Sequence, residues 1–255
     1  MINAVRDFGT GVGLLARGVR LVLGSGRLLV RGALPVLVTS VVLFAALVSL
    51  ALGIGGIVEW ATPFADDWSE VWRAALRTAM GIGVVFGAAA LGMVAFSALT
   101  LIIGSPFYES IAEEVEDREL GGVPEAQRIG WGRAAWLGLR DGVRMIGLAV
   151  VFGVGLFVAG FIPVVGQTVV PVVGVFVGAW LLGLELCAIP FVRRGVGLRE
   201  RRRVLGRRRA MTLGFAVPVY LLCLVPLVAL VVFPGAVAGG TLLAGRVREE
   251  EGIRG

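Results

Sequence analysis

The chain has 255 residues, of which 57% are hydrophobic and only 16% are charged. Soluble domains carry about 25% charged residues, so the polar surface is too small to cover a water-soluble particle. All 24 basic residues are arginine, and histidine is absent, which removes the usual metal ligand and the usual acid–base group near neutral pH. We therefore expect no enzyme, no metal site and no cofactor. Cys187 and Cys223 lie in apolar context and are interpreted as small core residues.

The N-terminal residues 1–31 place apolar side chains at helical spacing, with arginines elsewhere on the helical wheel. This pattern predicts an amphipathic helix that lies on the membrane, with its arginines at the lipid phosphates. The sequence Gly24-Ser25-Gly26 is expected to end it. We expect no cleavable signal peptide, because the first long apolar run begins only after Arg31.

Two uncharged stretches predict complete membrane spans, residues 32–58 and 78–106. Pro35 falls at the predicted start of the first span, where a proline is tolerated. Pro106 marks the end of the second span or a kink in it. Residues 107–120 then predict an acidic amphipathic helix, because apolar side chains share one face and glutamates surround the rest.

Two longer uncharged stretches, residues 145–184 and 210–245, are cut by prolines and predict helical hairpins at residues 145–192 and 210–245. The first hairpin has arms of about 18 residues, which is borderline for spanning. Residues 210–225 would measure about 24 Å, less than the hydrocarbon core of about 30 Å. We therefore expect partly penetrating hairpins, although the first could also span fully. Their turns should pack against the full spans, because non-helical backbone at membrane depth must be buried or line a wet cavity.

The arginines predict the orientation in the membrane. Of the 24, only two lie in residues 59–77, and the other 22 fall in segments that this topology places together. The arginine-rich side is normally cytoplasmic, so both termini, including a charged tail at residues 246–255, are expected inside the inner (plasma) membrane. Six complete spans would give the same distribution, and both topologies remain open.

Three features could carry function. Glu185 follows a long apolar run, and an ionisable residue near membrane depth often serves a pathway. It could line or gate a path together with Pro163 and Pro226 of the hairpin turns, or pair at the interface with an arginine of residues 193–209. That arginine-rich loop could contact anionic lipids or attract anions to a pore mouth. Nucleic acid is not an expected partner, because the rest of the chain lies in lipid.

The third feature is a possible anion site at the predicted start of the first span. A helix N-terminus exposes unpaired N–H groups and the positive end of the helix dipole. Two arginines precede this start, so the predicted anion-binding residues are Arg27, Arg31, Gly32, Leu34 and Pro35. The alternative is that these arginines anchor the helix end to lipid phosphates.

The motif SPFYESIAEEVED at residues 105–117 resembles the family of CysZ-type sulfate permeases and the etoposide-induced protein 2.4 domain. So does the C-terminal block that contains Glu185, Pro190, the arginine run, Val225-Pro226 and residues 234–242. The resemblance covers roughly residues 8–245. It implies two true spans, two partly penetrating hairpins, homo-oligomers and sulfate uptake. In the CysZ members a glycine-leucine-proline turn beside arginines binds sulfate. Here the matching sequence is Gly32-Ala33-Leu34-Pro35, with one residue inserted.

These observations predict an all-α membrane protein with two spans, two proline-split hairpins and amphipathic interfacial helices. The leading functional hypothesis is an inner-membrane permease or channel for a small oxyanion such as sulfate. The alternative is a non-transporting membrane scaffold whose arginine-rich loop binds lipid or a protein partner.

Overall fold

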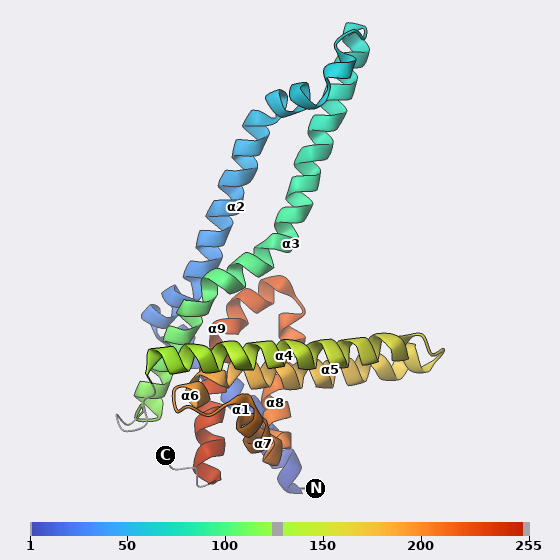
Figure 1. Cartoon of the computed structure of the whole chain (residues 1–255). Helices are drawn as coiled ribbons and strands as arrows, with labels where there is room; N and C mark the ends of the chain where they lie inside the picture. Colours follow the sequence, from blue (N-terminus) through green and yellow to red (C-terminus); the bar gives the residue numbers. More distant parts are fainter. Residues whose placement is uncertain (1, 124–129, 252–255) are drawn as a thin grey trace. The chain divides into compact units, whose positions relative to one another are not determined.

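The computed structural model describes residues 2–123 and 130–251, and every regular element within them is a helix (Figure 1). The predicted all-α class is therefore confirmed. The elements in chain order are α1 (Ile2–Gly24), α2 (Gly26–Ala61), the 3-10 helix η1 (Pro63–Ala65), α3 (Glu70–Glu119), α4 (Trp131–Gly160), α5 (Val165–Leu186), α6 (Ala188–Val192), α7 (Leu198–Arg207), α8 (Arg209–Cys223) and α9 (Pro226–Glu250).

The chain divides into two compact units, and both divisions fall beside a proline inside a long helix. The larger unit contains residues 1–32 and 108–255, and the smaller unit contains residues 33–107. Helix α2 continues through Pro35, and helix α3 continues through Pro106. A proline inside a helix removes one hydrogen bond, and its ring clashes with the carbonyl four residues earlier. The units therefore separate where each helix is locally weakened.

The smaller unit is an antiparallel helical hairpin made from α2 and α3, with η1 at its tip (Figure 1). Arg77 closes the tip from α3. Its guanidinium donates to the Thr62 hydroxyl at 3.1 Å and pairs with Asp66 at 2.7 Å. The Thr62 hydroxyl in turn donates to the Val58 carbonyl at 2.7 Å. These bonds satisfy polar groups where the chain reverses direction.

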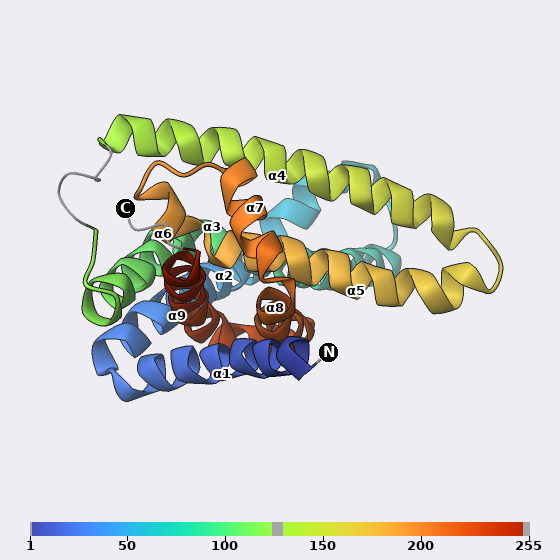
Figure 2. The same ribbon diagram turned by 90° about the horizontal axis from the view of Figure 1, so that it is seen from below.

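In the larger unit, α1 lies along α8 and α9 (Figure 2). Glycines permit this close approach, as they do between membrane helices. A Cβ atom at Gly11 would fall well inside 3.0 Å of the Met211 carbonyl oxygen of α8, and one at Gly18 would meet the backbone of Gly239 in α9. The predicted N-terminal helix is present as α1. Leu15 and Val22 lie in the core, whereas Val5, Phe8 and Val12 are exposed, and a position on the membrane surface stays a prediction.

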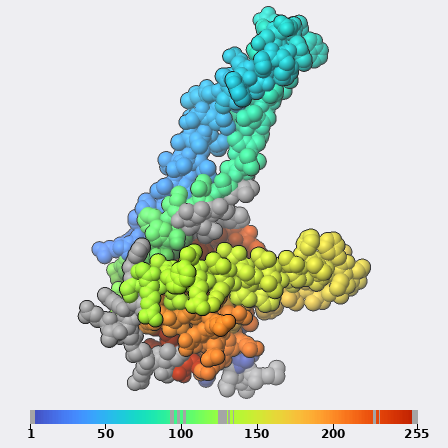
Figure 3. Space-filling model, in the orientation of Figure 1, coloured from blue at the N-terminus to red at the C-terminus, as the bar shows by residue number. Residues whose placement is uncertain are grey.

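Helices α4 and α5 form an antiparallel hairpin, and its two helices lie closest near the turn and diverge away from it (Figure 2). Residues 161–164 make the turn, so the turn predicted at Pro163 is confirmed. Val164 has φ 69°, a left-handed conformation that is rare for a β-branched residue. On the face shown in Figure 3, the far end of the hairpin, in yellow, stands clear of the other described segments of the larger unit.

Four segments are long and apolar enough to cross a membrane, by length and composition: residues 26–61, 70–92, 135–160 and 165–186. Their apolar side chains point outward. Leu52 is 84% exposed, and Phe86 is 73% exposed. Such surfaces suit hydrocarbon and not water. The two arms of the first hairpin qualify as spans by length, whereas α8, with 15 residues, is too short. How deeply either hairpin penetrates stays a prediction.

Two predicted helix starts, at residues 32 and 107, are wrong, because α2 and α3 each continue through a proline. Helix α2 begins at Gly26 and not at residue 32, so Pro35 lies inside it. Helix α3 runs through Pro106 to Glu119, so residues 107–120 do not form a separate helix. Helix α9 likewise continues through Pro234 and ends at Glu250. Helices in membranes tolerate proline where neighbouring groups satisfy the freed carbonyl.

Candidate functional site

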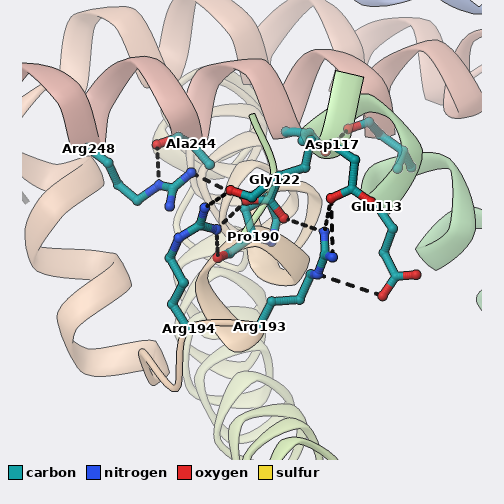
Figure 4. Close-up of polar contacts among 11 residues, drawn as sticks. Glu113, Asp117, Gly122, Pro190, Arg193, Arg194, Ala244 and Arg248 are labelled. Carbon is teal, nitrogen blue, oxygen red and sulfur yellow. Dashed lines mark hydrogen bonds and ion pairs between the residues drawn. The ribbon is translucent and has the colours of Figure 1, made fainter. Parts of the chain in front are cut away.

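The larger unit contains a fully buried carboxylate, Glu116, near the end of α3. Three arginines converge on it. Arg193 donates to it at 2.8 Å, Arg194 also donates to it, and Arg248 lies 3.4 Å away. Arg193 and Arg194 directly follow α6, and Arg248 belongs to α9 (Figure 4). Glu116 therefore ties together three segments that are far apart in the sequence.

Backbone carbonyls complete the coordination of these arginines, as Figure 4 shows. Arg194 donates to the carbonyls of Pro190 at 2.9 Å and Gly122 at 3.0 Å, and Arg248 donates to that of Ala244 at 3.2 Å. Burial and the like charge of Arg194 lower the pKa of Arg248, and Glu116 opposes this shift. The groups are satisfied by one another, so this cluster stabilises the fold and leaves little capacity for a ligand.

The two arginines of the predicted anion site have different environments. Arg27 is exposed and makes no ion pair among the described residues. Arg31 is partly buried and pairs with Glu114 of α3, which also pairs with Arg118. Arg31 would therefore have to exchange a carboxylate for an incoming anion, whereas Arg27 would not.

A small pocket lies at the actual start of α2, about two turns before the predicted start. Its volume is about 260 Å³, and its wall includes Arg20, Gly24, Ser25, Arg118 and Glu119. The first N–H groups of a helix have no partner within the helix, and those of α2 begin at Gly26, beside this pocket. Glu119 pairs with Arg17, which offsets its charge. The unpaired N–H groups and the nearby arginines expected at residues 32–35 are thus present near residue 25.

The remaining predicted anion-site residues lie inside α2. A Cβ atom at Gly32 would fall 2.6 Å from the ring of Pro234, so Gly32 permits the backbone at this position to approach Pro234 closely. Leu34 is partly exposed and Pro35 is buried. Pro35 lacks an N–H group, so the carbonyl of Arg31 has no helical partner. None of these residues is at a helix start, and their role in anion binding stays a prediction.

Glu185, near the end of α5, is exposed, and its carboxylate is an electrostatic neighbour of Arg201 in α7. This agrees with the alternative that Glu185 faces an arginine of residues 193–209. Arg201 itself is 1% exposed, and its Nε and Nη1 atoms make no hydrogen bond. Burial lowers the pKa of Arg201, whereas Glu185, Cys187 and Asp141 raise it. Asp141 accepts from the Leu198 N–H at 2.7 Å.

The two prolines predicted to line a path lie at helix boundaries. Pro163 is in the turn before α5, and its side chain is exposed. Pro226 is the first residue of α9, and its side chain lies outside the described part of the structure. Their role in a path stays a prediction.

A second, larger pocket lies over α7. Its volume is about 530 Å³, and its wall carries four arginines, Arg199, Arg202, Arg203 and Arg209, together with Trp180, Gly206 and Leu213. No acidic residue belongs to this wall as described. The arginine-rich loop predicted from the sequence is therefore mostly the helix α7, and one of its faces lines this pocket.

Comparison with known proteins decides the family. The chain matches the profile named Sulfate transporter CysZ/Etoposide-induced protein 2.4 over residues 14–234. The chain belongs to this family. It is similar to a sulfate transporter CysZ of Vibrio cholerae serotype O1, at 27% identity over 92% of each chain. It is also similar to one of Pseudomonas fluorescens, at 30% identity over 96% of each chain. The resemblance noted in the sequence is confirmed.

Membership of the CysZ family is membership of a transporter family and not of an enzyme family. Together with the four apolar helices of spanning length, it makes the chain a multi-pass membrane protein. Glu116 was not predicted from the sequence as a central residue. It follows Tyr108 and Ala112 at intervals of four, and both are buried, so its spacing places it on the apolar face of α3 but does not indicate its partners.

Proposed function

We propose that this member of the CysZ family is a permease or channel for a small oxyanion, with sulfate as its substrate. The observation that carries the proposal is likeness to proteins named sulfate transporter CysZ over more than nine-tenths of both chains. Because the sequence contains no nucleotide-binding loop, transport would be passive or coupled to an ion. The protein would lie in the inner membrane as a homo-oligomer, with both termini and the basic segments in the cytoplasm.

The pocket at the start of α2 is the proposed anion entry site. Arg20 lines the pocket, and Arg27 lies outside its wall at the start of α2. Neither makes an ion pair among the described residues, so both guanidinium groups are available to an oxyanion. The free N–H groups at the start of α2 add the positive end of the helix dipole. A volume of about 260 Å³ is ample for a five-atom ion. Arg31 would contribute once it exchanges Glu114 for the anion.

The path beyond this site would run beside the hairpin turns. We propose that Glu185, Pro163 and Pro226 line or gate it. Glu185 lies opposite the buried Arg201, so a change in its environment would alter the balance of charge around that guanidinium. The Glu185 carboxylate would thus be a charged group in the path that can respond to an anion.

Uptake of radioactive sulfate into proteoliposomes tests the function directly. We expect uptake above that of empty liposomes for the wild-type protein and a strong loss in the variant R20Q/R27Q. The control variant R133Q/R140Q removes two exposed arginines of α4 and should transport normally. Wild-type uptake equal to that of empty liposomes, from protein that elutes as a single folded species, would remove the transport proposal.

A variant at Arg31 tests the exchange of Glu114 for sulfate. Arg31→Ala should lower sulfate uptake while the protein remains folded, because it removes a guanidinium next to the entry site. Glu114→Gln should instead keep or raise uptake, because it frees Arg31 from its carboxylate partner. Equal losses in both variants would show that the pair matters only for the fold.

A non-transporting scaffold is the second candidate function, and the pocket over α7 favours it. Four arginines there share a wall with no acidic residue among the described lining. Such a surface would suit a lipid or protein partner whether or not the chain transports. Absence of sulfate uptake together with normal folding would support the scaffold hypothesis.

A further inference from the structure

The pocket over α7 contains a concentration of positive charge that the fold does not neutralise. Arg199, Arg202 and Arg203 are exposed and have no ion pair or hydrogen bond among the described residues. Arg209 donates only its Nε–H, to the Gly206 carbonyl at 3.0 Å. Glu200, the acidic residue of α7, does not line the pocket. Four guanidinium groups are thus gathered on one wall without a carboxylate partner.

The helical period of α7 explains why these arginines are free. Leu198, Arg201 and Leu205 face the core and are buried. Arg199, Arg202 and Arg203 lie on the opposite face of α7 and make no contact with the core, and Arg209 is the first residue of α8. The neighbouring arginines of the loop differ in this respect, since Arg207 pairs with Glu251 and Arg208 pairs with Glu250. The free charge therefore belongs to one defined face and not to the whole loop.

The remaining wall of the pocket is apolar and belongs to helices of the membrane domain. Trp180 comes from α5, a helix long and apolar enough to span, and lies near its C-terminal end. Tryptophan favours the boundary between hydrocarbon and water. Leu213 comes from the apolar helix α8. A ligand in this pocket would therefore meet guanidinium groups together with the apolar side chains of Trp180 and Leu213.

From this arrangement we infer that the pocket over α7 binds an acidic phospholipid whose headgroup carries two phosphates, of the cardiolipin type. Guanidinium groups match phosphate oxygens in bidentate geometry. Four of them exceed what one small oxyanion needs, and about 530 Å³ exceeds its size. Trp180 and Leu213 would contact the glycerol backbone and the first acyl carbons. Basic pockets beside membrane helices on the cytoplasmic side are typical of such headgroups. The inference is independent of sulfate transport.

Native mass spectrometry of the full-length protein in detergent, titrated with tetraoleoyl cardiolipin, tests the site. The variant R199Q/R202Q/R203Q should bind about 100-fold more weakly, at roughly fivefold for each arginine removed. The control R6Q/R133Q/R140Q removes the same charge from exposed arginines outside this pocket and should bind within about twofold of wild type. Equal binding by the two variants would overturn the inference.

Two further measurements separate the lipid from a free anion and from misfolding. Cardiolipin with brominated acyl chains should quench tryptophan fluorescence, and Trp180→Phe should remove much of that quenching. This readout does not depend on the arginine variants, and undiminished quenching in Trp180→Phe would overturn the site. Inorganic sulfate or phosphate at millimolar concentration should not displace the lipid. Full displacement would mean that the pocket is an oxyanion vestibule, which also overturns the lipid assignment.

Discussion

Replacement of Glu116 by glutamine should strongly destabilise the larger unit. Glutamine keeps nearly the same shape but removes the single negative charge that three arginines share. The side chains of Arg194 and Arg248 are only 11% and 10% exposed, so water cannot replace the lost carboxylate. Arg194 already lowers the pKa of Arg248, and in the variant nothing at this position would oppose that repulsion.

The magnitude follows from the cost of leaving buried charge uncompensated. Breaking a buried ion pair by removing one partner costs about 3–5 kcal/mol. For a protein of this size, each 1 kcal/mol lowers the melting temperature by about 2–4 °C. We therefore expect Glu116→Gln to melt about 6–20 °C below wild type. Glu113→Gln is the matched control, because Glu113 is 53% exposed and lies 3.8 Å from Arg193, so its loss should cost under about 1 kcal/mol.

Thermal unfolding of the purified protein in detergent measures these differences, and a double variant tests the reason for them. E116Q/R248Q should melt above the temperature expected from adding the two single effects, because it removes a like charge together with its counter-charge. A melting temperature for Glu116→Gln within about 2 °C of wild type would contradict this prediction. Strict additivity in the double variant would also contradict it, since the cluster would then not act as a unit.

Further predictions concern other parts of the larger unit. Gly11→Ala should lower the melting temperature through a clash with α8 that costs about 1–3 kcal/mol, whereas Gly13→Ala, with nothing within 4 Å, should be neutral or stabilising. Cys187 should resist alkylation by N-ethylmaleimide at pH 8 until the protein unfolds, since burial raises its pKa to about 12; rapid labelling, read by mass spectrometry, would contradict this. Asp141→Asn should lower the free energy of unfolding by about 1.5–3 kcal/mol, because it removes a negative charge near the buried Arg201. An unchanged melting temperature would show that Asp141 does not stabilise Arg201.

The sequence predicts the helices and most of their turns, because the signals for both are local. Long uncharged runs give the apolar helices, Ser25 separates α1 from α2, and the turn before α5 contains Pro163. The same local signals wrongly predict helix boundaries beside Pro35 and Pro106, where α2 and α3 continue. Each proline removes only one hydrogen bond, so neighbouring contacts decide whether the helix ends or continues. Those contacts come from distant parts of the chain and have no local signature.

The buried cluster could not be predicted from spacing for a related reason. Glu116 and Arg248 are 132 positions apart, and nothing near either residue indicates the other. The acidic face of α3 instead favoured a solvated helix, which is correct for Glu113 and wrong for Glu116. Which carboxylate of α3 is paired in the interior can be told only from the packing of the helix, since its exposed neighbours are also acidic.

The nine arginines of residues 193–209 show why a count of charges is a poor guide to function. Arg193 and Arg194 are held by Glu116, and Arg201 is buried in the core. Two others pair with glutamates of the C-terminal segment. The four that remain line one pocket, so the field that attracts an anion arises there. Variants at Arg193 or Arg194 should thus affect stability first, and variants of the pocket arginines should affect binding at unchanged stability.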